Sequence, residues 1–309
     1  MTDVYEKLLK MNKLRAKIRW RVSAIPISEE DLIKDLLSSN LLKPGDIVMV
    51  HSSLSSIGNV IGGPEVVCRA FQKVLTETGT LLMPSYHQPE PILKMIKKGV
   101  LVDLRTAKSY MGKLTETFRT LPGVERSSHP FSSVCAWGRY AKELTNGHSR
   151  SPYICGPGSP FFELVERSGK YMGIGIDIRV IALYHVLEDN WDGFPIKVHY
   201  PEPFKVRYID ANGKLIEREL VLLDPEVSRT RIDQEVRGAW IRKRLTHYMK
   251  SQGILHAFKL GHSTSWIVDA KPFYEQLKFL AQKGITIYTT EKEFEAMGRW
   301  EDFSFTPHG

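Results

Sequence analysis

A strand–helix–strand pattern in the first third of the chain sets the class of fold. A short apolar run at residues 47–50 is bounded by turn residues, which is typical of a buried parallel strand. Gly62-Gly63-Pro64 then opens a helix that continues to about residue 76, and a second apolar run follows at residues 81–84. Two strands joined through a helix form a βαβ unit, whose strands lie parallel in one sheet.

The same alternation returns near the middle of the chain. Residues 158–167 have the pattern of a helix, residues 171–176 that of a third core strand, and residues 181–189 that of a further helix. Strands that alternate with helices predict a mostly parallel sheet covered on both faces. We therefore expect an α/β fold whose core spans residues 28–195.

The pattern changes from about residue 196. Residues 204–209 alternate between apolar and polar side chains, and Asn212-Gly213 is a hairpin turn signal. Three further elements are expected: a charged helix or helix pair over residues 225–252, a helix over 272–283 and a last strand over 285–288. Residues 196–309 are predicted to form a smaller antiparallel and helical lobe that completes the same domain.

The chain is basic, with 43 Lys and Arg against 35 Asp and Glu, which gives a net charge of +8 at pH 7. Such a balance suits an anionic partner, but scattered cations that merely keep a protein in solution are equally compatible with it. Much of the excess lies in residues 7–21, a basic amphipathic helix within an N-terminal segment of residues 1–27. We expect this helix to pack by its apolar stripe rather than to bind a membrane or nucleic acid.

The cysteines and histidines show no metal-site pattern. Cys68, Cys135 and Cys155 form no CxxC pair, and HExxH is absent, so no metal is expected. Sparse cysteines favour a reducing compartment. Apolar runs long enough for a membrane helix and a signal-peptide core are both absent from the sequence. We expect a cytoplasmic protein without a membrane or nucleic-acid partner, and the sequence leaves its oligomeric state open.

His185 and Glu188 form a candidate catalytic pair. On a helix, positions i and i+3 share a face, so the imidazole and the carboxylate are neighbours. The pair follows a predicted strand and a glycine-containing loop, and ligands of open α/β sheets gather beyond the carboxyl ends of strands. A histidine beside a carboxylate can act as a general base whose orientation the acid fixes. A structural histidine next to a surface glutamate has the same spacing, and spacing alone leaves both interpretations open.

A polar segment follows directly after the first strand: His51, Ser52, Ser53, Leu54 and Ser55. Hydroxyls and free backbone amides at such a position can hold a phosphate or the amides of pantetheine, although a capping turn would contain the same residues. The segment is not a P-loop, because no Gly-Lys-Ser/Thr follows it. The GxSxG motif of serine hydrolases is also absent, so the sequence offers no convincing serine nucleophile.

Six blocks of the sequence, in order, resemble the aminoglycoside 3-N-acetyltransferase family. The first is GDIVMVHSSLSSIGNVIGGPEVVCRAFQKVLTETGTLLMPSY at residues 45–86, and the second is MGKLTETFRTLPGVERSSHPFSS at residues 111–133. Shorter blocks follow: AWG at 136–138, GPGSP at 156–160, GIG at 173–175 with HVLE at 185–188, and KLGHS at 259–263 with DA at 269–270. The resemblance covers roughly residues 30–295.

This resemblance implies an αβα sandwich with a smaller lobe, and an enzyme that uses acetyl-CoA as co-substrate. The cofactor would lie in a cleft beside the His51–Ser55 segment and beside five residues of the second block: Arg126, Ser127, Ser128, His129 and Ser133. His185 would take a proton from the substrate amine, with Glu188 positioning it, and the acetyl group would pass directly to the amine. An ammonium with a pKa near 10 must lose a proton before it attacks a thioester, so a base within reach lowers the barrier.

Three departures from the family's usual pattern bear on the acceptor. Ala182 stands where the family usually has Thr, Arg179 where it often has Asp, and Phe131-Ser132 where it often has Thr-His. A pocket for polycationic aminoglycosides should present carboxylates, so Arg179 suits an anionic acceptor better, such as an amino sugar on a nucleotide diphosphate. We expect Arg179 and Tyr86 to contact the substrate. Arg179 could equally point to solvent or to the CoA phosphates.

The leading interpretation is acetyl-CoA-dependent N-acetylation of a primary amine on a sugar-like small molecule, with a biosynthetic amino sugar preferred over an aminoglycoside antibiotic. Ala182 motivates a second interpretation, in which the chain binds CoA but has lost catalysis. The net charge of +8 motivates a third, a nucleic-acid or membrane-surface protein. That third interpretation explains none of the six blocks.

Overall fold

The computed structural model describes residues 25–232 and 239–297. The predicted N-terminal basic helix falls almost entirely outside these residues. The first described helix, α2 (Glu29–Ser38), begins where its acidic first turn predicts. Ser28 accepts a hydrogen bond from the amide of Asp31, and the Asp31 carboxylate accepts one from the amide of Ser28. This capping box satisfies two backbone donors that would otherwise be unpaired at the helix start.

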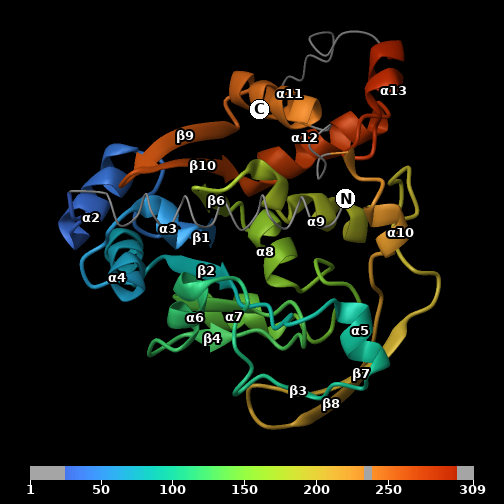
Figure 1. Ribbon diagram of the computed structural model, residues 1–309, viewed down its shortest axis with the longest axis horizontal. Coiled ribbons are helices and arrows are strands. Elements are labelled where there is room, and N and C mark those ends of the chain that lie inside the picture. Colours follow the sequence, from blue (N-terminus) through green and yellow to red (C-terminus); the bar gives the residue numbers. More distant parts are fainter. Residues whose placement is uncertain (1–24, 233–238, 298–309) are drawn as a thin grey trace, which may run out of the picture.

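A seven-stranded sheet forms the centre of the molecule, in the order β4-β5-β2-β1-β6-β10-β9 (Figure 1). Its strands are β1 (Ile47–Ser52), β2 (Thr80–Pro84), β4 (Glu125–Arg126), β5 (Val134–Gly138), β6 (Lys170–Ile174), β9 (Leu255–Leu260) and β10 (Ser263–Asp269). The three central strands β2, β1 and β6 run parallel, as the βαβ pattern predicts. Antiparallel pairs extend the sheet on both sides, so that the parallel part is its centre.

Helices cover both faces of this sheet and bury two separate apolar clusters. The first face packs against α2, α4 (Pro64–Leu75) and α6 (Lys113–Arg119). The second face packs against α7 (Ala141–Asn146), α8 (Pro160–Glu166), α9 (Leu183–Asn190), α11 (Ala239–Ser251) and α12 (Ala270–Gln282). Along β1, Val48 and Val50 point into the first cluster and Met49 into the second, which is the alternation of a strand buried on both faces. The α/β class with helical layers is confirmed.

A smaller three-stranded sheet, β3-β7-β8, lies at one end of the molecule (Figure 1). Strands β7 (Phe204–Ile209) and β8 (Leu215–Leu220) form the predicted hairpin, with Gly213 at a positive φ of 84° in its turn. Strand β3 (Val102–Asp103) pairs parallel to β7, and α5 (Ile92–Lys97) packs against the same apolar cluster. The smaller lobe is therefore confirmed, and it takes β3 and α5 from the first half of the chain.

The C-terminal third of the described chain differs from the expectation in two ways: strands β9 and β10 of the central sheet were not predicted, and one predicted strand is not formed. The predicted helix pair is present as α10 (Pro225–Ser228) and α11. The strand predicted over residues 285–288 was wrong, because these residues form turns between α12 and α13 (Glu291–Ala296). Their side chains still point into the core, since Ile285, Ile287 and Tyr288 are buried. Burial of alternate residues produced the strand-like pattern without a neighbouring strand to pair with.

Candidate functional site

The candidate site lies at the carboxyl ends of β1 and β6. The amide of Ser53, just after β1, donates to the carbonyl of Ile174 at the end of β6, at 2.8 Å. The chain then passes from β6 through a short 3₁₀ turn, η1 (Ile178–Val180), into α9. Helix α9 carries the HVLE block, so this connection places it above the strand ends where ligands of α/β sheets bind.

Two glycines allow the close packing at this edge. A Cβ at position 173 would lie 2.2 Å from the indole of Trp266, and a Cβ at position 175 would lie 1.7 Å from Oγ of Ser56. Gly175 also has a positive φ of 62°, which disfavours any other residue. The glycine block of the sequence is therefore explained by packing, because it lets β10 and the segment after β1 approach β6.

His185 and Glu188 meet as their spacing predicts. Nδ1 of His185 lies 2.6 Å from Oε2 of Glu188. The Glu188 side chain is 1% exposed, whereas that of His185 is 26% exposed, so the acid is buried behind a ring that solvent can reach. This arrangement fixes the plane of the imidazole and leaves its other nitrogen, Nε2, on the far side from the carboxylate.

Tyr288 is a third member of this network, and sequence reasoning missed it. Its hydroxyl donates to Oε1 of Glu188 at 2.9 Å. Burial raises the pKa of the Glu188 carboxyl, but His185, Arg231 and Tyr288 together bring that pKa below its ordinary value. The carboxylate is therefore charged at neutral pH, and both of its oxygens have a hydrogen-bond partner.

Arg231 determines the tautomer of His185. Its Nη1 lies 3.3 Å from Nε2 of His185, and the Arg231 side chain is largely buried. A guanidinium can only donate hydrogen bonds, so Nε2 must be the unprotonated, accepting nitrogen. Nδ1 then carries the proton and donates it to Glu188. In this geometry Nδ1 of His185 faces Glu188 and Nε2 faces Arg231.

The segment after β1 is joined to the start of α9 through Tyr171. The Tyr171 hydroxyl lies 2.7 Å from Nε2 of His51 and accepts a hydrogen bond from the amide of Ala182 at 3.1 Å. The rings of His51 and Tyr171 stack at 5.1 Å between centroids. Burial lowers the pKa of His51 to about 4, so this ring is neutral at physiological pH.

The other predicted cofactor residues after β1 lie around the same turn. Oγ of Ser52 is buried without a hydrogen-bond partner among the described residues. Oγ of Ser53 lies 3.3 Å from Oγ of Ser55, and Leu54 begins the four-residue helix α3 (Leu54–Ile57). A buried unpaired hydroxyl is costly in a protein without a partner from outside, so Ser52 marks this turn as a place for a polar ligand group.

Arg126 and Ser133 belong to an internal network on the β4–β5 side. The Arg126 guanidinium donates to the carbonyls of Leu104, Ala107 and Ser85 and to Oγ of Ser133. Oγ of Ser133 in turn donates to the Ser85 carbonyl at 2.8 Å. Burial lowers the pKa of Arg126. These donors are engaged by protein groups of the same network.

Ser127, Ser128 and His129 are likewise held by protein groups. Oγ of Ser127 lies 2.8 Å from Nδ1 of His148, and Oγ of Ser128 lies 3.1 Å from the Tyr208 hydroxyl. Nδ1 of His129 accepts from the amides of Phe131 and Ser132, while its buried Nε2 has no partner among the described residues. The block is therefore a rigid buried turn with one unpaired nitrogen.

Arg179 and Tyr86 occupy different surroundings. Arg179 lies in η1, between β6 and α9, is partly exposed, and has no ion-pair partner within the described residues. Tyr86 is partly buried and packs against Phe161, with ring centroids 6.4 Å apart. Burial raises the pKa of Tyr86 well above 10, so its hydroxyl is neutral. The structure places Arg179 close in sequence and space to the site and Tyr86 at the end of β2.

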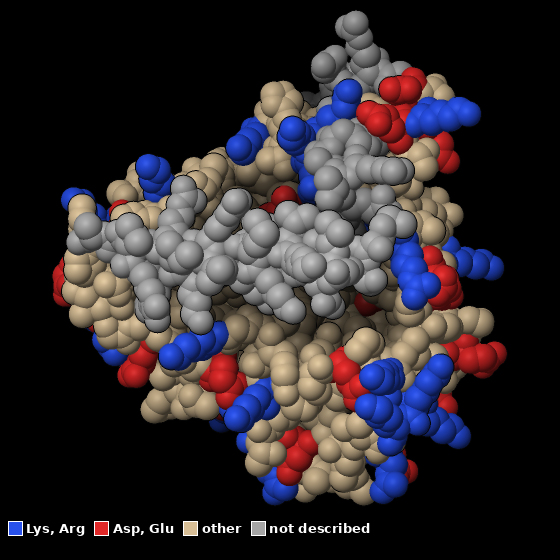
Figure 2. Space-filling view, in the orientation of Figure 1, with Lys and Arg blue, Asp and Glu red and all other residues tan. Residues whose placement is uncertain are grey.

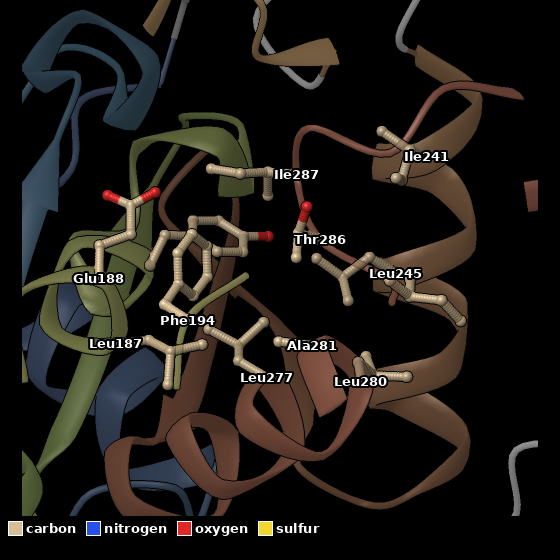
Figure 3. A pocket seen from close by; sticks show the side chains of 12 residues that line it. Leu187, Glu188, Phe194, Ile241, Leu245, Leu277, Leu280, Ala281, Thr286 and Ile287 are labelled. Carbon is tan, nitrogen blue, oxygen red and sulfur yellow. The ribbon is translucent and has the colours of Figure 1, made fainter. Parts of the chain in front are cut away.

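A small cavity of about 30 Å³ lies next to Glu188 (Figure 3). Figure 3 shows Glu188 on one side and Ile241 and Leu245 of α11 on the other. Its lining is apolar except for Glu188 and Thr286. The cavity is far smaller than the roughly 300 Å³ of typical ligand pockets, so it is too small to hold a substrate.

Within residues 25–232 and 239–297, no three His, Cys, Asp or Glu side chains are grouped so that they could hold a metal ion. None of the helices described in the structure has the length and apolar character needed to cross a membrane. Cys68, Cys135 and Cys155 are buried and form no disulfide with one another.

Comparison with known proteins gives consistent matches across most of the chain. A family model described as aminoglycoside 3-N-acetyltransferase matches residues 49–280. Aminoglycoside N(3)-acetyltransferase IX of Micromonospora chalcea is 28% identical over 263 residues, which span 81% of this chain and 91% of that protein. The SPbeta prophage-derived aminoglycoside N(3')-acetyltransferase-like protein YokD of Bacillus subtilis is 32% identical over 182 residues, 54% of this chain and 66% of that protein.

Solved structures have the same fold. The crystal structure of aminoglycoside acetyltransferase AAC(3)-Xa superposes with a TM-score of 0.70 at 28% identity, over 85% of this chain and 95% of that one. AAC-IIIb in binary complex with CoASH superposes with a TM-score of 0.65 at 22% identity, over 81% of this chain and 94% of that one. At 22% identity, the likeness to AAC-IIIb shows a shared fold alone.

Proposed function

The chain belongs to the aminoglycoside 3-N-acetyltransferase family and is an acyltransferase, and on that premise we propose that it transfers the acetyl group of acetyl-CoA directly to a primary amine, with His185 as the general base. One observation carries this proposal. Nδ1 of His185 lies 2.6 Å from the buried carboxylate of Glu188, so Nε2 points away from Glu188, toward Nη1 of Arg231 at 3.3 Å.

The chemistry needs one proton acceptor and no covalent enzyme intermediate. The ammonium first releases one proton to solvent, and Nε2 of His185 then takes a second proton from the neutral amine as its nitrogen attacks the thioester carbonyl. The new C–N bond forms as a tetrahedral intermediate, which collapses with cleavage of the C–S bond. CoA leaves as a thiolate and receives the proton from the imidazolium. Glu188, held by Tyr288, stabilises the imidazolium while it exists.

For the cofactor, we divide the predicted contacts into two groups. Ser52, Ser53, Leu54 and Ser55 are proposed to contact acetyl-CoA directly, which the unpaired Oγ of Ser52 supports. The second group is proposed to hold the neighbouring turn in the conformation that receives the cofactor, without touching it. It consists of Arg126, Ser127, Ser128 and Ser133, whose polar groups bind protein atoms. Nε2 of His129 is the group of that turn left to meet a ligand or a water molecule.

For the acceptor, we propose an amino sugar or similar amine that carries a negative charge. Two cations support this: Arg231, whose Nη1 lies 3.3 Å from Nε2 of His185, and Arg179 in η1. The substrate amine must take the place of Arg231 at Nε2, so the guanidinium would then lie next to the acceptor. A polycationic aminoglycoside would be repelled there, whereas a phosphate or carboxylate would be attracted. Tyr86 is proposed to line the acceptor side.

The similar proteins are aminoglycoside acetyltransferases, which favours an aminoglycoside acceptor instead, and an assay separates the two substrate classes. Release of the CoA thiol from acetyl-CoA would be followed against a panel of cationic, neutral and anionic amines. Turnover of anionic amino sugars with poor turnover of aminoglycosides supports the proposed acceptor. Efficient turnover of aminoglycosides with poor turnover of anionic amino sugars excludes it. If no amine is acetylated although CoA binds, the chain is a CoA-binding protein that has lost catalysis.

The base is tested by comparing wild type with His185→Ala on the best amine of that panel. Loss of a general base predicts a fall in kcat of roughly two to four powers of ten. CoA affinity, measured by calorimetry, should change little, because His185 acts on the acceptor. Full activity in the variant would exclude His185 from the mechanism.

A further inference from the structure

A second hollow, separate from the cavity behind Glu188, lies under helix α11. It has a volume of about 460 Å³, within the usual range for small-molecule sites. Its walls come from three places: the segment 176–178 after β6, one face of α11, and the adjoining ends of β9 and β10. It therefore lies on the β10 side of β6, whereas the predicted CoA residues lie on the β1 side.

The α11 wall of this hollow is strongly basic. Arg242, Lys243, His247 and Lys250 line it; Lys243, His247 and Lys250 are spaced by four and three residues and so lie along one face of the helix, with Arg242 next to them. No acidic residue occurs anywhere in α11. Figure 2 shows Lys and Arg side chains gathered around α11 on the face in view.

Among the described residues, the lysines of this wall have no acidic partner. Asp177 is the acidic residue among the described residues lining the hollow, and its carboxylate lies 3.6 Å from Nε of Arg242. Lys243 and Lys250 are exposed and make no ion pair within the described residues. An ordinary solvated helix face mixes both signs of charge, since like charges at this spacing repel one another. An anion in the hollow would relieve that repulsion.

The floor of the hollow is aromatic and rigid. Trp266 is 8% exposed, and its Nε1 donates to the carbonyl of Ile176 at 2.8 Å. Its ring stacks on Tyr171 at 6.2 Å between centroids, with planes 7° apart. Its indole packs on Gly173 of β6, where a Cβ would lie 2.2 Å from the ring, and Trp266 also lines the hollow. A fixed indole therefore forms part of the lining next to the cationic wall of α11.

We propose that this hollow binds a nucleoside diphosphate group. The diphosphate would lie against Lys243, Lys250 and Arg242, and the nucleoside would pack over Trp266, with the hydroxyls of Thr246 and Thr264 within the same lining. Cations on a helix face bind phosphate oxygens by charge-assisted hydrogen bonds. The group has two possible sources, the ADP end of CoA or a nucleotide carried by the acceptor. Binding here does not depend on proton transfer by His185.

Calorimetric titration of the full chain with ADP tests the site. The double variant Lys243→Glu/Lys250→Glu should bind ADP at least roughly tenfold more weakly than wild type, because two attractive charges become repulsive. The matched control is Lys205→Glu/Lys214→Glu on the β7–β8 hairpin, which makes the same change in net charge at exposed positions away from the hollow. Circular dichroism confirms that both variants fold.

Titrations with CoA and with UDP then identify the source. An equal loss of CoA affinity in the Lys243/Lys250 variant assigns the hollow to the cofactor. Loss of ADP and UDP binding with unchanged CoA affinity assigns it to a nucleotide-bearing acceptor. Equal weakening by the control variant, or unchanged ADP binding in the Lys243/Lys250 variant, overturns the site. His185→Ala should bind ADP like wild type, so the result is independent of the proposed catalysis.

Discussion

The hydroxyl of Tyr171 lies 2.7 Å from Nε2 of His51 and at the same time accepts the amide proton of Ala182. His51 belongs to the segment after β1, and Ala182 immediately precedes the helix that carries His185. One buried hydroxyl therefore sets the distance between the proposed cofactor turn and the proposed base. Because Trp266 stacks on the same ring, the aromatic row of His51, Tyr171 and Trp266 also extends to the basic hollow under α11.

Tyr171→Phe should destabilise the protein and lower its activity. The substitution keeps the ring but leaves the Ala182 amide and Nε2 of His51 without their shared partner. Unpaired buried groups cost about 1–3 kcal/mol, so the free energy of unfolding in urea should fall by that amount. Tyr110→Phe, which removes a hydroxyl from an exposed side chain, is the control. Unchanged unfolding in Tyr171→Phe would show that this hydroxyl does not hold the two segments together.

Tyr288→Phe should impair catalysis without loss of CoA binding. The Tyr288 hydroxyl donates to Glu188 at 2.9 Å and helps to lower the pKa of that carboxyl. Loss of this hydrogen bond should raise the activation free energy by about 1 kcal/mol, because Glu188 and His185 are held less well, so kcat should fall roughly fivefold. The acid limb of the kcat/KM profile should also move to higher pH, because the carboxylate would bind the protonated ring more strongly.

The control for this variant is Tyr274→Phe, a partly buried tyrosine that packs against the same apolar cluster. A merely structural role for Tyr288 would lower stability in both variants but leave the pH profile of the active fraction where it was. The shift of the acid limb is therefore the decisive measurement.

Much of this site follows from local sequence, and the remainder depends on long-range contacts. The i, i+3 spacing of His185 and Glu188 fixes their contact wherever the helix lies in the fold. Tyr288 is 100 residues away from Glu188 and reaches it from a turn that the sequence pattern presents as a strand. The local sequence around Tyr288 does not predict this contact, although a buried tyrosine hydroxyl usually has a hydrogen-bond partner.

The same distinction applies to the sheet. The parallel strands were predictable because each is a short apolar run next to a helix start with its own capping residues. β9 and β10 show no regular alternation of buried and exposed residues, and the place of β10 beside β6 depends on the close approach of Trp266 to Gly173. Arg126 illustrates the opposite case. The family resemblance implied a place beside the cofactor, whereas the fold directs its guanidinium to three backbone carbonyls.

Stability should decrease as the pH falls below neutrality. Burial lowers the pKa of His51 to about 4 and that of His148 to about 3, against 6.5 for an ordinary histidine. Below 6.5 the unfolded chain takes up these protons while the folded chain does not. The stabilisation is therefore complete above about pH 6.5 and is lost progressively down to the folded pKa values.

Urea unfolding at about pH 7.5 and about pH 5 measures this loss, which should amount to several kcal/mol. His148→Gln should reduce the dependence on pH, because one titrating group is removed. His256→Gln, at an exposed position, should retain it. Equal stability of wild type at the two pH values would contradict the neutral buried state of both histidines.

Ala182→Thr tests whether the lack of a hydroxyl at residue 182, just before the helix that carries His185, limits the rate of the proposed reaction. Ala182 is 6% exposed, and its backbone is helical (φ −73°, ψ −6°), a conformation open to threonine. A hydroxyl added beside the thioester could donate to the developing oxyanion, so kcat should rise, by roughly tenfold or more if the bond forms. Extra volume in a buried site should lower stability by about 1–3 kcal/mol.

Ala182→Val has the same shape without the hydroxyl, and it should show the loss of stability alone. Equal kcat in the Thr and Val variants would mean that the missing hydroxyl has no part in catalysis by this chain.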